Sequence, residues 1–151
     1  MKRGAALFCQ VVVVLIGIAI LAFLLWEPHL EGRNAHATTF EIYCKDPFLA
    51  YVYAGSIPFF VALTRAFGVL GHFRKNGKLS PATADALRAI RRCAMAVIGF
   101  VAGGVVIILM FGDPDDRPAG FFMSLLVTIG AGAIATAATM FERSLRPAGT
   151  R

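Results

Sequence analysis

The side chains best suited to bind a metal ion or a small molecule gather in one short segment, residues 27–47. Histidine, glutamate and cysteine are common ligands of transition metals. Their spacing here matches no established ligand pattern, so we predict no metal site and expect no cofactor. The segment can instead be an ordinary polar cap or a surface that senses a small molecule or peptide. The candidate sensing residues are His29, Glu31, His36 and Glu41.

The three cysteines do not have the spacing of a redox pair. The sequence contains no C-x-x-C motif, and Cys44 is expected on the opposite side of a membrane from Cys9 and Cys93. Nucleophile elbows, glycine-rich phosphate loops and paired catalytic carboxylates are also absent from the sequence. We therefore expect no enzymatic activity.

A second candidate binding segment is a basic cytoplasmic loop predicted between two apolar blocks, residues 72–92. Within it, residues 82–92 are expected to begin a helix that then enters the membrane, after a cap at Ser80–Pro81. The cations of this loop can fix the topology of a membrane protein while they contact anionic lipid headgroups. They can also dock a cytoplasmic regulatory protein. Direct nucleic-acid binding is not expected, because no recognised nucleic-acid-binding motif accompanies the charge. The candidate partner or lipid contacts are Arg74, Lys75, Lys78, Arg88, Arg91 and Arg92.

The elements that position these segments are indicated by hydropathy. Of the 151 residues, 58% are hydrophobic and only 16% are charged, whereas a soluble domain has about 25% charged residues. The apolar residues form four blocks, each close to the roughly 20 residues that a membrane helix needs. Irregular backbone cannot face lipid, so the blocks should be helical. The predicted fold is an all-α, single-domain integral membrane bundle with four spans, at about residues 5–26, 48–71, 93–111 and 119–141.

The distribution of charge predicts the orientation of these spans. Most of the 15 basic residues fall before the first span, around the 72–92 segment and after the fourth span, whereas most of the 9 acidic residues fall on the other side. By the positive-inside rule, both termini are predicted to be cytoplasmic. The first block is longer than the roughly 7–15 apolar residues of a signal peptide and is predicted to be a retained anchor.

Small residues predict how the spans pack. Span three contains the G-x-x-x-G motif Gly99–Gly103, which allows close helix contact. In span four, a small or hydroxyl residue recurs at every fourth position. We predict contact between these two spans within one chain, with a homodimer face as the alternative, and a kink in span two at Pro58. The span-four stripe is Ser124, Thr128, Gly132 and Thr136, and Trp26, Tyr43, Tyr51 and Tyr53 are expected to form an interfacial aromatic belt.

Ionisable side chains deep in a membrane usually mark transport or proton transfer, and the predicted spans contain almost none. Arg65 lies near the end of span two and can reach the interface, while all three histidines are predicted in loops. The leading hypothesis is therefore a non-enzymatic regulatory, sensing or interaction protein. The alternative is a small transporter or channel subunit whose polar path contains Gln10, Ser56, Thr64, Thr128 and Thr136.

Short motifs give the sequence a family resemblance over nearly its whole length. They are FEIY at residues 40–43, KDPF at 45–48, KLSP at 78–81 and LRAI at 87–90, together with the span-two proline. The sequence resembles a family of small four-span bacterial membrane proteins catalogued as a domain of unknown function, often encoded beside a helix-turn-helix regulator. The resemblance implies a sensor, or a protein that sequesters a regulator, in a bacterial inner membrane. It supplies no catalytic residue.

Overall fold

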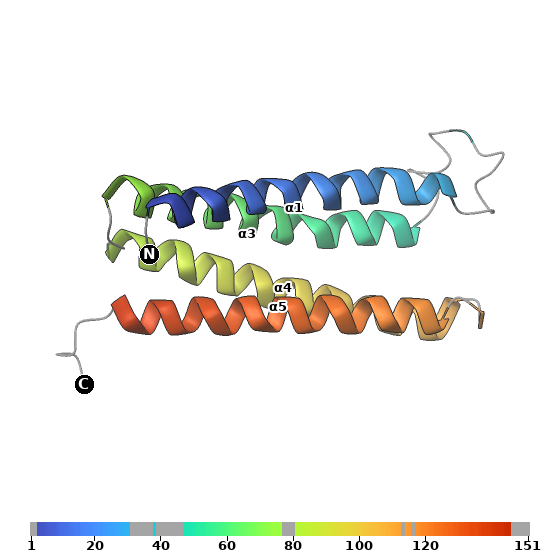
Figure 1. Ribbon diagram of the computed structural model, residues 1–151. Coiled ribbons are helices and arrows are strands. Elements are labelled where there is room, and N and C mark those ends of the chain that lie inside the picture. Colours follow the sequence, from blue (N-terminus) through green and yellow to red (C-terminus); the bar gives the residue numbers. More distant parts are fainter. Residues whose placement is uncertain are drawn as a thin grey trace.

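The part of the chain that the structure describes forms four long helices. The computed structural model describes residues 3–30, 38, 47–76, 81–112, 114–115 and 117–145, and these residues contain no strand. At 28 to 31 residues, each helix is about 42–47 Å long and exceeds the roughly 30 Å hydrocarbon thickness. All four are apolar enough to cross a membrane, which confirms the predicted all-α membrane fold. The helices are α1 (Arg3–Leu30), α3 (Pro47–Asn76), α4 (Pro81–Phe111) and α5 (Arg117–Leu145) (Figure 1).

The helix boundaries follow from local chemistry. Helices α3 and α4 begin at Pro47 and Pro81, because proline suits the first helical position, where no backbone N–H is needed. Helix α3 continues through Pro58 as one helix. At the end of α4, Arg117 donates from Nε and Nη2 to the Gly112 carbonyl at 3.3 and 3.1 Å. This cation caps the negative end of the α4 dipole.

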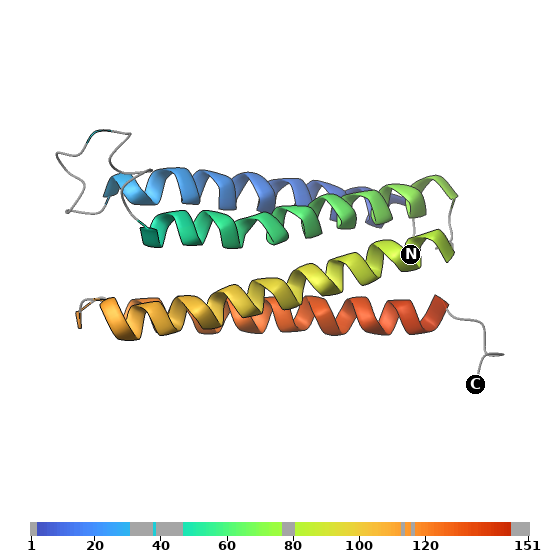
Figure 2. The ribbon, with the colours of Figure 1, turned by 180° about the vertical axis from the view of Figure 1, so that it is seen from behind.

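Helices that are neighbours in sequence are neighbours in space. Helix α1 packs on α3, α3 packs on α4, and α4 makes its most extensive contact with α5. In the two opposite views, the α1–α3 pair lies alongside the α4–α5 pair (Figures 1 and 2). The end of α3, the start of α4 and the end of α5 lie together, and we call this the basic end.

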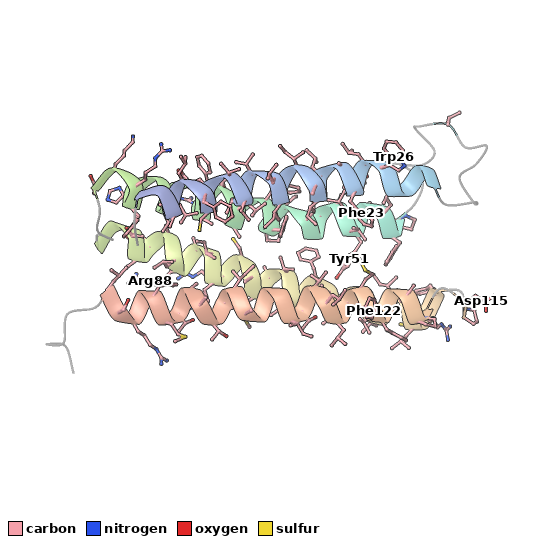
Figure 3. All side chains as sticks on the ribbon, in the orientation of Figure 1. Phe23, Trp26, Tyr51, Arg88, Asp115 and Phe122 are labelled. Carbon is pink, nitrogen blue, oxygen red and sulfur yellow. The ribbon has the colours of Figure 1, made fainter. Side chains whose placement is uncertain are left out.

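The contact between α4 and α5 is lined by alanine. Ala94 of α4 forms a buried cluster with Ala131 and Ala135 of α5, and small side chains allow this close approach. The predicted contact between spans three and four is confirmed, but the predicted stripe is wrong. Thr136 is exposed, and its hydroxyl donates to the carbonyl of Gly132 in its own helix at 2.8 Å. Large apolar side chains such as Trp26 and Phe122 lie outside and suit contact with lipid (Figure 3).

The G-x-x-x-G motif serves a different contact from the one predicted. A methyl group at Gly103 would overlap the Tyr51 hydroxyl of α3, whereas one at Gly99 would meet nothing within 4 Å. Tyr51 donates to the Phe100 carbonyl at 2.8 Å, and the two rings lie 5.4 Å apart. The motif therefore supports the α3–α4 contact, because the missing side chain at Gly103 leaves room for Tyr51.

Polar side chains also join α1 to α3. Tyr53 of α3 donates to the Leu24 carbonyl at 2.7 Å, and the buried Gln10 amide donates to the Phe67 carbonyl at 3.3 Å. Instead of only facing the interface as an aromatic belt, Tyr51 and Tyr53 tie helices together. Each such bond is worth about 0.6 kcal/mol on average within a membrane.

Substituting the two glycines of the motif separately tests this assignment. Gly103→Ala should lower the free energy of unfolding by about 1 kcal/mol, because the new methyl group displaces the Tyr51 hydroxyl from Phe100. Gly99→Ala is the matched control and should be neutral or slightly stabilising, since alanine favours helix. Thermal unfolding of the two variants in detergent would compare them. Equal destabilisation would contradict the assignment.

Candidate interaction site at the basic end

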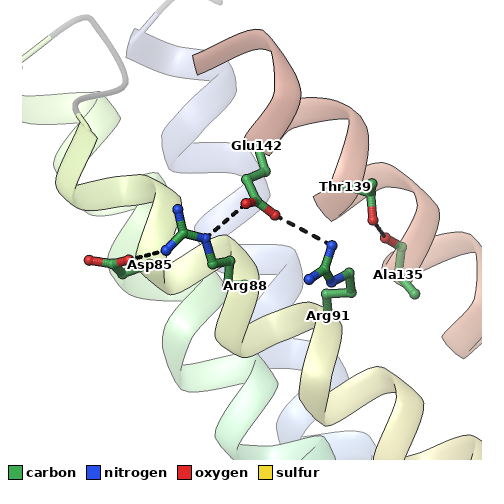
Figure 4. A network of polar contacts seen from close by, with 6 residues as sticks. All are labelled: Asp85, Arg88, Arg91, Ala135, Thr139 and Glu142. Carbon is green, nitrogen blue, oxygen red and sulfur yellow. Dashed lines mark hydrogen bonds and ion pairs between the residues drawn. The ribbon is translucent and has the colours of Figure 1, made fainter. Parts of the chain in front are cut away.

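A buried carboxylate organises the basic end. Glu142, near the end of α5, has a side chain only 4% exposed and lies between two arginines of α4 (Figure 4). Its Oε1 accepts a hydrogen bond from Arg88 Nε at 2.8 Å, and its Oε2 is 3.6 Å from Arg91 Nη1. Arg88 Nη1 also donates to Asp85 at 3.0 Å. We call these four residues the ion-pair cluster.

The cluster joins α4 to α5 where both helices carry buried apolar residues. Leu87 and Ile90 of α4 pack with Ala138 of α5 directly beside it. A buried carboxylate is costly unless it is paired and hydrogen-bonded, so Glu142 requires its arginines. The arginines remain about 40% exposed, so they keep N–H groups available for other acceptors.

The structure divides the six predicted contact residues. Arg88 and Arg91 belong to the ion-pair cluster, while Arg74, Lys75 and Arg92 are exposed and have no ion pair among the described residues. Lys78 lies outside the described residues. The 72–92 segment is also largely helical, because α3 continues to Asn76 and α4 begins at Pro81. The predicted loop is therefore wrong for residues 72–76, whereas the helix expected over residues 82–92 is confirmed by α4.

Glu142 and Asp85 were not among the predicted site residues. Both are acids on the side where basic residues dominate, and this charge contrast is a signal for pairing. Span four was expected to end at residue 141. Glu142 therefore fell just after the predicted span and was not considered as part of a helix contact. The helix instead continues to Leu145 and keeps the carboxylate facing α4.

Packing sets the level of each cation relative to the hydrocarbon. The apolar run 93–111 covers about 28 Å, close to a full hydrocarbon thickness, so Arg92 marks its edge. Ala66 and Val69 of α3 pack against the buried cluster formed by Leu87, Ile90 and Ala138. This register brings the exposed Arg65 close to the level of Arg92.

Of the candidate sensing residues, the structure describes only His29, at the end of the helices opposite the basic end. His29 lies in the last turn of α1, and His72 lies in α3, where it is 3.0 Å from the Asn76 amide. Both had been expected in loops, and this expectation is wrong. Glu31, His36 and Glu41 lie outside the described residues. In the described part of the chain, no three histidine, cysteine, aspartate or glutamate residues are close enough to hold a metal ion.

The hydroxyl groups proposed to line a polar path donate hydrogen bonds to backbone carbonyls of their own helices. Ser56 and Thr64 donate to Tyr53 and Val61 carbonyls, and Thr128 donates to that of Ser124. Thr64 is also exposed on the outer surface of the helices. These bonds are local, and none of them joins one helix to another.

The four long apolar helices of the described residues define a membrane protein. The chain belongs to the family described as "Protein of unknown function (DUF2975)", which matches residues 32–149 and so includes α3, α4 and α5. It is 30% identical over 149 residues to "Uncharacterized membrane protein YoaS" of Bacillus subtilis (strain 168), covering 98% of this chain and 93% of that protein. No solved structure matches the chain. The resemblance inferred from the short motifs is thereby confirmed.

Proposed function

We propose that this protein is a non-enzymatic regulatory protein of the bacterial inner membrane, with both termini in the cytoplasm, that binds a soluble regulatory partner at its basic end. The observation that carries the proposal is the position of Arg74 and Lys75. Both are exposed in the last turn of α3 and have no ion pair among the described residues.

The level of these two cations favours a soluble partner. By the packing register, they lie about 14 Å beyond Arg65, at about 1.5 Å per residue. This exceeds the roughly 5–7 Å of interfacial region on each side of the hydrocarbon. Cations at that height reach the aqueous phase, where they attract and orient an acidic surface. Arg88 and Arg91 are less suited to this role, because Glu142 already engages them.

Neutralising the two cations tests the proposal. The double variant Arg74→Gln/Lys75→Gln should recover about tenfold less of a stoichiometric soluble partner than the wild type, equivalent to about 1.4 kcal/mol of binding. The measurement is co-purification of the tagged protein from native membranes in mild detergent, followed by quantitative mass spectrometry. Raised salt should release the partner, because screening weakens exposed charge contacts.

The matched control removes the same amount of positive charge from positions closer to the hydrocarbon. Arg92→Gln/Arg143→Gln neutralises two other exposed cations of the basic end and should leave partner recovery nearly unchanged. Cysteine accessibility would verify that both double variants keep the wild-type orientation. Equal loss of partner in the two double variants, or no soluble partner from wild-type membranes, would refute the proposal.

A further inference from the structure

We propose that Arg88 and Arg91 bind the phosphate group of an anionic phospholipid, at a site held in shape by Glu142. This inference does not rest on the proposed function, because lipid binding is measured on the purified protein without any partner. It concerns Arg88 and Arg91, the two predicted contact residues that belong to the ion-pair cluster.

The two arginines lie at the level of lipid phosphates. With Arg92 at the hydrocarbon edge, Arg91 and Arg88 lie about 1.5 and 6 Å outside it, at the helical rise of about 1.5 Å per residue. The interfacial region that contains headgroups is roughly 5–7 Å thick on each side. Basic sites between membrane helices at this level commonly bind anionic headgroups.

The guanidinium groups have donors to spare. Arg88 uses Nε for Glu142 and Nη1 for Asp85, and Arg91 approaches Glu142 through Nη1. A guanidinium has five N–H donors, and its planar fork matches phosphate oxygens. Because both side chains are about 40% exposed, the unused donors can reach a ligand.

One positive charge beside this site is not balanced by a carboxylate among the described residues. Within the ion-pair cluster, two arginines face two carboxylates, so their charges balance. The adjacent Arg92 is exposed, has no ion pair among the described residues and adds one positive charge. A phosphodiester carries one negative charge and would balance it. Glu142 is 4% exposed and restrains two long side chains in advance, which reduces the conformational entropy lost on binding.

Apolar surface beside the cluster favours a lipid over a soluble anion. Met95 is 57% exposed and follows Arg91 by one helical turn, so both residues lie on the same side of α4. Phe141 of α5 is also exposed and directly precedes Glu142. Acyl chains would cover these side chains while the phosphate contacts the arginines.

Native mass spectrometry of the purified full-length protein in detergent tests the proposal with defined lipids. The wild type should retain phosphatidylglycerol and release phosphatidylcholine, which carries no net charge. Arg91→Gln should retain about tenfold less phosphatidylglycerol, because a charge-assisted hydrogen bond is lost while Arg88 still holds Glu142. Lys75→Gln removes the same charge from outside the headgroup layer and should retain lipid as the wild type does.

A second variant separates lipid binding from folding. Arg91→Lys keeps a positive charge beside Glu142 but loses the planar fork, so it should remain folded and retain less phosphatidylglycerol than the wild type. Equal retention by the wild type, Arg91→Gln and Arg91→Lys would overturn the proposal. Equal retention of the two lipids would also overturn it, as would thermal stabilisation by inorganic phosphate equal to that by phosphatidylglycerol.

Discussion

Replacing Glu142 with lysine is expected to lower the free energy of unfolding by about 3–5 kcal/mol, the range for breaking a buried ion pair. The carboxylate is almost fully buried between Arg88 and Arg91, so the new ammonium group would meet two cations with no acid between them. The loss is large because attraction becomes repulsion and a charge remains unpaired away from water. Thermal and SDS-induced unfolding in detergent would measure it.

A lysine on the same turn provides the matched control. Ser144 is exposed, so Ser144→Lys adds a positive charge that water can solvate, and stability should stay within about 0.5 kcal/mol of the wild type. Exchanging the charges in the double variant Arg88→Glu/Glu142→Arg should recover part of the stability lost in Glu142→Lys. A Glu142→Lys protein as stable as Ser144→Lys would show that the ion-pair cluster does not hold α4 to α5.

The four membrane-length helices of the described residues could be predicted from the sequence because lipid imposes strict requirements. Four apolar blocks of sufficient length must be helical, and the prolines at positions 47 and 81 mark two starts. The helix ends were harder to predict, since hydropathy locates the hydrocarbon rather than the helix. Helix α5 passes the apolar limit and keeps Glu142 in a regular turn.

The partners of each helix face could not be predicted from spacing alone. The G-x-x-x-G motif indicates that a helix can approach another closely, but it does not specify which neighbour does so. In α4 the neighbour at the motif is α3, because the Tyr51 hydroxyl of α3 occupies the space at Gly103. Helix α5 has a second face of small residues, formed by alanines. Ala131 and Ala135 of that face are buried against α4, and the predicted hydroxyl stripe is not.

The candidate site could be located at the basic end from charge, but not divided into its two parts. Charge counting treats Arg74 and Arg88 alike, since both carry one positive charge on the same side. Only the facing helix distinguishes them, because Glu142 reaches Arg88 and Arg91 and leaves the cations of α3 exposed. The pairing depends on the register between α4 and α5, which connects residues 54 apart in sequence.

Ala135→Leu is expected to lower the free energy of unfolding by about 1–3 kcal/mol, the usual cost of adding bulk to a packed core. Ala135 is buried with Ala94 and Ala131, and Val97 and Ile98 of α4 pack against the same cluster. A leucine would push α4 and α5 apart at their most extensive contact. Two turns farther along α5, that separation should also lengthen the Glu142–Arg88 contact.

Two further variants test whether the contact between α4 and α5 is the cause of the lost stability. Ala137→Leu makes the same chemical change at an exposed position of α5 and should leave stability within about 0.5 kcal/mol of the wild type. The double variant Ala135→Leu/Ile98→Ala should recover part of the loss, because removing bulk from α4 makes room for the leucine. If Ala135→Leu and Ala137→Leu unfold alike, the alanine face is not a tight interface. The lipid site at Arg88 and Arg91 would then lack a rigid support, since the arginines are positioned through the contact that these alanines permit.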